Sequence, residues 1–262
     1  MTTPEEIKSC CATAYGQDAV ALVLGESYHP GGLALTRRLA DCLGLRCGQR
    51  VGDIASGAGA TACALAVEYD VTVDGVDLSE STVERARTTA EKAGLSGKVR
   101  FHLGDAERLP VPDNTFDALV CECAFCTFPD KATAAAEFAR VLRPGGRVGV
   151  TDVTVAGSGL PEELTTLASW VACIADARSV RDYTEILADA GLRTTRVEAH
   201  DAAVARMIDQ IEARLGVLRM TAADRLTAAG VEVDAVVRYT ALAKQAVAQG
   251  LIGYCLLIAE KP

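Results

Sequence analysis

The sequence is poor in histidine and in aromatic residues, with three histidines, one tryptophan and 5% aromatic residues among 262. Half of the residues are hydrophobic, yet no uninterrupted apolar run approaches the ~20 residues that cross a bilayer. The first residues, Met-Thr-Thr-Pro-Glu-Glu, have neither the basic nor the apolar region of a signal peptide. We therefore expect a cytoplasmic protein that does not engage a membrane.

Basic clusters are also missing from the chain. The 26 lysines and arginines are outnumbered by 35 aspartates and glutamates, which gives a net charge of −9. Nucleic-acid-binding proteins gather basic residues on one surface or helix, and no such stretch is visible here. We therefore expect no nucleic-acid partner, and a chain of this length is sufficient for one domain with an appendage.

The most informative segment is the glycine-rich run Val-Gly-Asp-Ile-Ala-Ser-Gly-Ala-Gly at residues 51–59. It is typical of a buried strand that ends in a tight turn before a helix, which we expect to begin at about Thr61. The next apolar strand ends in Asp77, 18 residues after Gly59. An acid at the tip of the second strand of a βαβ unit can accept both hydroxyls of a ribose. The pattern predicts a nucleoside site.

The same run differs from the loop that binds a dinucleotide. The third glycine is missing, and Asp53 precedes the turn, where an acid repels a pyrophosphate and attracts a cation. Asp53 to Gly59 resembles D-x-G-x-G-x-G, the first motif of the class I S-adenosylmethionine (SAM) methyltransferases, with Ala55 in place of the first glycine. Three further segments, at 104–110, 114–120 and 140–146, resemble this family, and together the segments span roughly residues 30–200.

The resemblance implies a Rossmann-like α/β fold with a mostly parallel seven-stranded sheet and SAM as cofactor. Strand and helix patterns alternate after residue 50, with strands expected near 50–55, 72–77, 99–103, 116–122, 146–153 and 193–199. Helical spacing dominates 201–249 and precedes a last apolar strand. We expect an N-terminal helical segment (1–30), a SAM-binding core (31–200), a helical insertion (201–249) and the last core strand (250–262). The insertion either roofs the acceptor pocket or is a structural helix pair.

The resemblance also implies roles for individual residues. Asp77 would bind the ribose, Asp105 with Ala106 would contact the adenine, and Asp53 would lie near the ammonium of the cofactor. Gly57 and Gly59 would pass close to its methionine part. The full set of expected cofactor residues is Asp53, Ala55, Gly57, Gly59, Asp77, Leu78, Gly104, Asp105, Ala106 and Glu122.

Ten cysteines are unusual for a protein expected in a reducing compartment, where they should be thiols. Three of them, in Cys121-Glu-Cys-Ala-Phe-Cys126, lie at the expected end of the fourth strand, where open α/β sheets bind ligands. On a strand, Cys121 and Cys123 would point to the same face. Thiolates at short spacing suit zinc, with a fourth ligand from Cys10, Cys11 or Cys173, and they equally suit a soft acceptor such as trivalent arsenic.

Two segments around these thiols resemble the arsenite SAM methyltransferases. Glu122 to Lys131 resembles the segment of the first metalloid-binding cysteine, and Trp170 to Ala177 resembles that of its partner. The resemblance implies As(III) as substrate, bound by Cys123 and Cys173, and a thiol reductant such as glutathione or thioredoxin as partner. The implied catalytic thiols are Cys123, Cys173, Cys10, Cys11 and Cys126; the N-terminal pair and Cys126 depart from the family pattern.

Three other interpretations remain open at this point. The first is a C-, N-, O- or S-methyltransferase of metabolite or natural-product biosynthesis, in which His29, Tyr28 or Glu122 would be the polar groups of interest. The second keeps a soft acceptor but replaces arsenic by a thiol, a selenide, a tellurite-derived species or an organomercurial. The third is a SAM-binding or metalloid-sensing protein without turnover, which would need a DNA-binding element that the sequence does not display.

Overall fold

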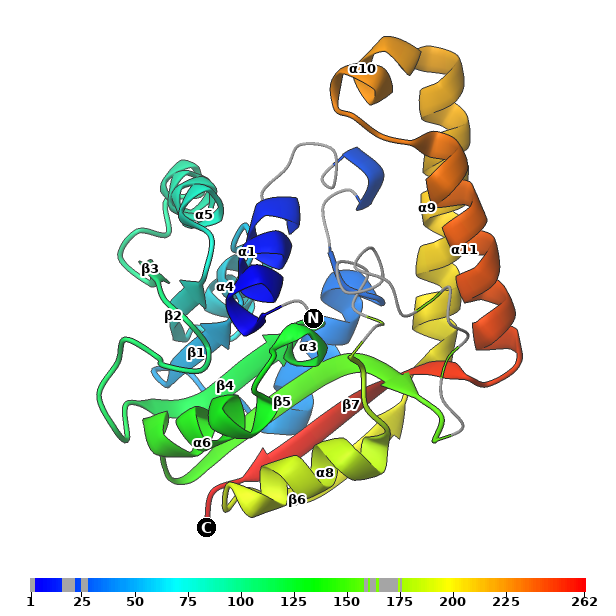
Figure 1. Cartoon of the computed structure of the whole chain (residues 1–262). Coiled ribbons are helices and arrows are strands. Elements are labelled where there is room, and N and C mark those ends of the chain that lie inside the picture. Colours follow the sequence, from blue (N-terminus) through cyan, green and yellow to red (C-terminus); the bar gives the residue numbers. More distant parts are fainter. Residues whose placement is uncertain are drawn as a thin grey trace.

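The computed structural model describes residues 3–15, 22–24, 28–157, 160, 164, 174 and 176–262 (Figure 1). A seven-stranded sheet forms its centre, in the order β3-β2-β1-β4-β5-β7-β6. Strand β7 runs antiparallel to β5 and β6, and the other neighbours are parallel. The strands are β1 (Arg50–Ile54), β2 (Thr72–Asp77), β3 (Val99–Leu103), β4 (Phe116–Glu122), β5 (Leu142–Val155), β6 (Arg193–Ala199) and β7 (Ile252–Glu260). The predicted Rossmann-like α/β fold is confirmed.

Helices cover both faces of this sheet. Helix α3 packs on α4 behind the sheet, and α6 packs on α8 over the opposite face, while α5 lies against β2 and β3 (Figure 1). The helices are α1 (Pro4–Tyr15), α3 (Gly32–Leu43), α4 (Ala60–Glu68), α5 (Glu80–Lys92), α6 (Lys131–Val141), α8 (Val180–Asp189), α9 (Asp201–Thr221), α10 (Ala223–Ala228) and α11 (Val233–Ala248). No helix among the described residues is long and apolar enough to cross a membrane.

Helices α9, α10 and α11 occupy the chain between β6 and β7. Helices α9 and α11 pack side by side and project from the end of the sheet, with α10 at their tip (Figure 1). Helix α9 is also in contact with β7, so the pair is anchored on the sheet at its base. The predicted helical insertion before the last strand is therefore present.

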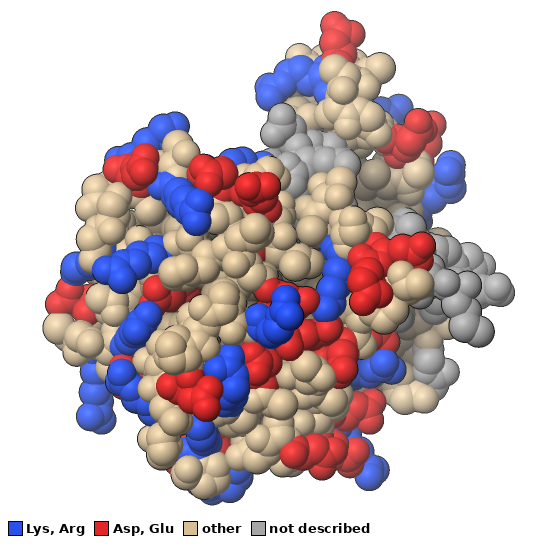
Figure 2. Space-filling model, turned by 60° about the vertical axis from the view of Figure 1, so that its left-hand side comes forward, with Lys and Arg blue, Asp and Glu red and all other residues tan. Residues whose placement is uncertain are grey.

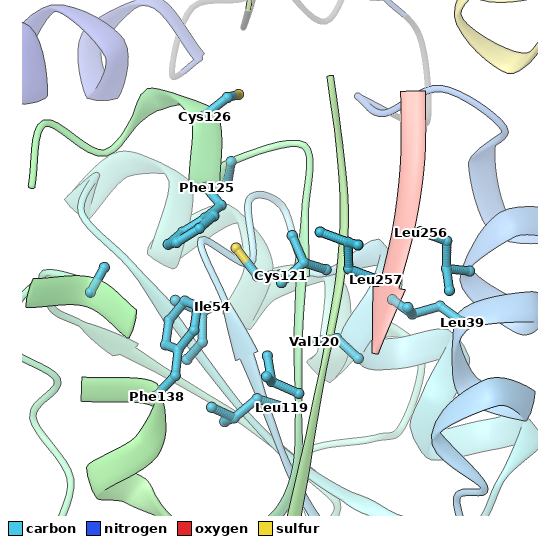
Figure 3. Packing of buried hydrophobic residues seen from close by; sticks show 14 of the residues in the cluster. Leu39, Ile54, Leu119, Val120, Cys121, Phe125, Cys126, Phe138, Leu256 and Leu257 are labelled. Carbon is cyan, nitrogen blue, oxygen red and sulfur yellow. The ribbon is translucent and has the colours of Figure 1, made fainter. Parts of the chain in front are cut away.

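The core consists of apolar side chains from both sheet faces. Leu39 of α3 lies near Leu256 of β7 on one side, whereas Ile54 and Phe138 pack on the other (Figure 3). These four side chains are fully buried, as expected for a sheet that is covered by helices on both faces. This packing holds the carboxyl ends of β1, β2 and β4 at one edge.

Strand β5 begins four residues earlier than the sequence predicted. Phe116 of β4 pairs with Leu142, but Ala118 pairs with Arg147, so the one residue between them on β4 faces four on β5. The extra residues bulge outward at Pro144-Gly145-Gly146, where Gly145 has φ 76°. A proline and two glycines favour a turn, and this explains why the sequence predicted the strand only after them.

The glycine turn after β1 requires left-handed backbone at several positions. Gly59 has φ 83°, and a Cβ there would lie 2.5 Å from the ring of Phe101, so only glycine fits. Gly57 has φ 53° with open space around it. Ala55 has φ 59°, a conformation that a residue with a Cβ adopts at a cost.

We expect Ala55→Gly to stabilise the protein by about 0.5–1 kcal/mol. The substitution removes the left-handed strain at φ 59° and leaves the turn otherwise unchanged. The gain is smaller than the strain itself because glycine also raises the entropy of the unfolded chain. Urea denaturation of both proteins measures the difference. A lower unfolding midpoint for the variant would contradict the strained turn.

Candidate cofactor and acceptor site

A cavity of about 340 Å³ lies at the carboxyl ends of β1, β2 and β4. The turn after β1, the tip of β2, the loop after β3 and the segment after β4 form its walls, and α1 with Tyr28 and His29 adds a further wall. Parallel strands end at a common edge, so these loops converge although they are distant in sequence. Of the predicted cofactor residues, all but Gly59 line this cavity: Asp53, Ala55, Gly57, Asp77, Leu78, Gly104, Asp105, Ala106 and Glu122.

The carboxylate of Asp77 is fixed by the backbone around it. Its Oδ2 accepts a hydrogen bond from the Gly57 N–H and its Oδ1 one from the Ser79 N–H, both at 2.9 Å. Burial raises its pKa, and the two backbone donors oppose that shift. A carboxylate offers about four lone-pair sites, so Asp77 keeps acceptor capacity on its cavity side. This geometry suits the two hydroxyls of a ribose.

Two further acids present unsatisfied oxygens in the same region. Asp53 is 2% exposed, and its Oδ2 has no hydrogen-bond partner among the described residues. Burial raises the pKa of Asp53 well above 3.8, and the neighbouring charges of Glu122 and Asp77 raise it further. Glu122 Oε1 is likewise buried without a partner in the described part of the chain. A cationic ligand compensates such a site, because it replaces the missing partner and favours the charged carboxylates.

We expect Asp53→Asn to stabilise the ligand-free protein at neutral pH by on the order of 1 kcal/mol. The folded pKa of Asp53 lies above the unfolded value, so the native state binds more protons. The contribution of protonated Asp53 to the free energy of unfolding is then fully present below about pH 4 and is lost as pH rises through the folded pKa. Asparagine does not titrate, so the variant does not lose this contribution. Urea denaturation of both proteins between pH 4 and pH 8 tests this. A stability difference that shrinks toward pH 8 would contradict it.

Glu122 is the centre of a polar network that links three elements. Its Oε2 accepts hydrogen bonds from Thr36 Oγ1 of α3 at 2.9 Å and from Thr61 Oγ1 of α4 at 2.7 Å. The Nε2 of His29 lies 3.6 Å from the same oxygen. The sequence predicted Glu122 in the site but gave no signal for the two threonines, because their hydroxyls reach it from helices packed behind the sheet.

Among the described residues, two thiols line the cavity, those of Cys11 on α1 and Cys123 after β4. Strand β4 ends at Glu122, and Cys123 has φ 53°, a left-handed conformation unusual for cysteine. Its N–H donates to the Thr151 carbonyl of β5 at 2.6 Å, which fixes the residue at the edge of the sheet. Such strain clusters at functional sites, and here it occurs at a residue that lines the cavity.

The other candidate thiols are placed differently. Cys126 is 1% exposed, and its N–H donates to Asp152 Oδ2 at 2.8 Å, so it lies in the core behind the cavity wall. Cys10 is half-buried on α1 and does not line the cavity. Cys173 lies outside the described residues. Within the described ranges, no group of three or more His, Cys, Asp or Glu residues has the arrangement of a metal site, so the structure lends no support to a zinc cluster there.

Cys121 does not share a face with Cys123. It is fully buried among core residues such as Ile54, Leu119 and Phe125 (Figure 3). Burial raises its pKa well above 9, with Asp152 as the next cause. The expected alternation ends because Cys123 leaves the strand in a left-handed turn. Cys121 is therefore a packing residue.

Helix α1 reaches the cavity through Lys8, a residue that the sequence analysis did not single out. The Lys8 ammonium donates to Asp105 Oδ2 at 2.8 Å and also pairs with Glu107. This ion pair joins α1 to the loop after β3 across almost 100 residues of sequence. It holds the N-terminal helix, with Cys11, against the predicted adenine side of the cavity.

Comparisons with known proteins agree with this geometry. Residues 52–150 match the family model for a methyltransferase domain. The chain is 33% identical over 278 residues to 27-O-demethylrifamycin SV methyltransferase of Amycolatopsis mediterranei, which covers 99% of this chain and 98% of that protein. It is also 33% identical over 158 residues to arsenite methyltransferase of Halobacterium salinarum, covering 59% of this chain and 40% of that protein.

The fold is shared with solved methyltransferases. Phosphoethanolamine N-methyltransferase 2 of Haemonchus contortus, solved with S-adenosyl-L-methionine, superposes with a TM-score of 0.80 at 22% identity. The alignment covers 99% of this chain and 57% of that one.

Proposed function

The chain belongs to the class I SAM-dependent methyltransferases, and we propose that it transfers the methyl group to a soft acceptor held by thiols, with trivalent arsenic as that acceptor. The observation that supports this most is that Cys11 and Cys123 line the same cavity as the cofactor residues. Thiolates are the ligands that soft acceptors select. The similarity to arsenite methyltransferase of Halobacterium salinarum is consistent with the proposal.

SAM supplies an electrophilic methyl group on a sulfonium, and the chain would position it. Asp77 would accept the ribose hydroxyls, and Asp53 would face the ammonium of the methionine part. The unsatisfied Asp53 Oδ2 fits this role, because a buried carboxylate oxygen without a partner is stabilised by a cation. Asp105 and Ala106 would lie at the adenine, and Gly57 with its open side would allow close approach of the backbone.

Cys123 and Cys11 would bind As(III) as thiolates, with the third sulfur from Cys173 or an external thiol. The arsenic lone pair forms the new As–C bond while the S–C bond to the methyl group breaks and S-adenosylhomocysteine leaves. Arsenic is thereby formally oxidised from III to V, and two equivalents of an external thiol, or one dithiol, return it to III as they form a disulfide. A lone pair carries no proton, so the reaction needs positioning rather than a base.

The proposal is tested by measuring S-adenosylhomocysteine release from purified protein with SAM, glutathione and arsenite. We expect release that depends on arsenite and saturates with its concentration. A matched reaction without arsenite gives the background, and one without glutathione is expected to stop after about one turnover. SAM binding without arsenite-dependent release would contradict arsenic as the acceptor.

A small organic acceptor is the second candidate, and one observation favours it. His29 lines the cavity, and its Nε2 lies 3.6 Å from Glu122 Oε2, an arrangement that can orient a general base. The relative that spans nearly the whole chain is named for methylation of an organic molecule.

His29→Gln separates the two candidates. We expect arsenite methylation to change by less than about threefold, since no proton is removed from the acceptor, whereas loss of a general base costs about 100-fold or more. Initial rates with saturating SAM measure the effect, and Cys47→Ser, far from the cavity, is the control. A 100-fold loss for His29→Gln with unchanged SAM affinity would show that the reaction needs a base, which contradicts attack by an arsenic lone pair.

A further inference from the structure

A second cavity, of about 640 Å³, lies between α3 and α9. The residues around it include Leu24, His29, Arg206, Met207, Ile211 and Arg214. His29 lines this cavity and the cofactor cavity alike, so the two meet at its ring. A molecule bound in the second cavity would therefore lie next to the cofactor cavity.

The α9 wall of this cavity is basic. Arg206, Gln210 and Arg214 stand four residues apart, which places them on one face of the helix. Arg214 is half-buried and donates one hydrogen bond from Nη1 to the Val23 carbonyl at 3.0 Å, leaving most of its five N–H donors for other partners. Arg206 is exposed at the rim.

Neither arginine has an acidic partner among the described residues. Several other arginines of this acidic chain pair with carboxylates, as Arg37 does with Glu68 and Arg38 with Glu198. Acidic and basic side chains are likewise interspersed on the face drawn in Figure 2. These two arginines lie on one cavity wall and have no carboxylate partner in the part of the chain that the structure describes, so an anionic ligand would complete their hydrogen bonding.

We propose that this second cavity binds a small organic molecule through its carboxylates, with Arg206 and Arg214 as the anion-binding residues. The identity of the ligand rests on the proposed function, because arsenite methylation requires an external thiol as reductant. A thiol that carries carboxylates could bind the arginines and also reach the point near His29 where the two cavities meet. The other source of the same chemistry is a carboxylated organic acceptor.

The spacing of the arginines agrees with a ligand of tripeptide size. Eight residues of helix separate their Cα atoms by about 12 Å. An extended tripeptide reaches roughly 10 Å, and flexible arginine side chains close the difference. Glutathione has a carboxylate at each end and its thiol in the middle. It can thus contact both arginines while its sulfur faces the cofactor cavity. The apolar side chains of Leu24, Met207 and Ile211 would pack against its backbone.

Binding is tested first without turnover, by calorimetry of S-methylglutathione with protein loaded with S-adenosylhomocysteine. We expect binding to the unmodified protein and about tenfold weaker binding, or more, to the double variant Arg206→Gln/Arg214→Gln, since charge-assisted hydrogen bonds are lost. Arg219→Gln, an exposed arginine of the same helix outside the cavity, is the matched control and should bind as the unmodified protein does. Equal affinity of the double variant, or no binding at all, would overturn the proposal.

Turnover then distinguishes the two sources. If the ligand is the reductant, the glutathione concentration for half-maximal arsenite methylation rises about tenfold in the double variant. The corresponding concentration of uncharged dithiothreitol is the same for the double variant and the unmodified protein. If arginine-dependent binding is seen but both reductants give unchanged rates, the site serves a carboxylated acceptor. Arginine-dependent binding without any arsenite turnover would refute arsenic as acceptor and leave the anion site standing.

Discussion

Replacing Cys123 by serine is expected to lower the rate of arsenite methylation by about 100-fold or more while leaving SAM affinity within about twofold. Serine keeps the size of the side chain but offers an oxygen that binds trivalent arsenic poorly at neutral pH. Cys123 lies after β4 at the cavity, on backbone with φ 53°, and serine does not alter that conformation. Initial rates with saturating arsenite, together with calorimetry of SAM binding, measure both quantities.

The control for this prediction is Cys47→Ser. Cys47 is exposed and donates to Asp70 Oδ2 at 2.8 Å, and it does not line the cavity. We expect this variant to keep its activity. The rate of arsenite methylation by Cys11→Ser should fall between those of Cys123→Ser and Cys47→Ser, because Cys11 on α1 is the second thiol at the cavity. If Cys123→Ser kept more than half of the activity, the thiol-held acceptor would be wrong.

Asp77→Asn is expected to weaken SAM binding by about 100-fold. Two charge-assisted hydrogen bonds to the ribose hydroxyls would be replaced by weaker contacts with an amide. The amide retains one oxygen for the Gly57 or Ser79 N–H, so the turn itself should survive. Calorimetry with SAM measures the affinity.

Asp70→Asn serves as the control for Asp77→Asn. Asp70 precedes β2 and is exposed on the surface, where it pairs with Lys98. We expect its SAM affinity to be unchanged. Thermal unfolding of both variants checks that the fold is intact. A decrease in SAM affinity smaller than about threefold for Asp77→Asn would show that this acid does not bind the ribose.

Most of the sheet could be predicted because its signals are local. Strand β2 runs over Thr72–Asp77, as the apolar stretch ending in an acid indicated, and the glycine turn after β1 leads into α4 one residue before the expected Thr61. The start of β5 was missed because the bulge at 143–146 has a turn composition, although the chain returns to the ladder on either side. The start of β5 is set by its pairing with β4, and this pairing cannot be read from a single sequence.

The site could be predicted only as far as motif residues extend. Asp53, Asp77 and Glu122 lie at the carboxyl ends of β1, β2 and β4, and these strand ends gather at one edge of the sheet. The contact between Lys8 and Asp105 joins residues 97 apart, and no spacing rule signals it. The thiols show the limit most clearly. Strand alternation paired Cys121 with Cys123, but a left-handed residue at Cys123 leaves one thiol in the core and the other at the cavity.

The most direct test of a thiol-held acceptor is the identity of the methylated product in a single turnover. Protein mixed with one equivalent each of SAM and arsenite is quenched and separated by chromatography with elemental detection of arsenic, while S-adenosylhomocysteine is quantified in the same sample. We expect methylated arsenic in equal amount to S-adenosylhomocysteine, and neither product above background in Cys123→Ser. Arsenic recovered entirely as arsenite, from protein that binds SAM, would contradict it.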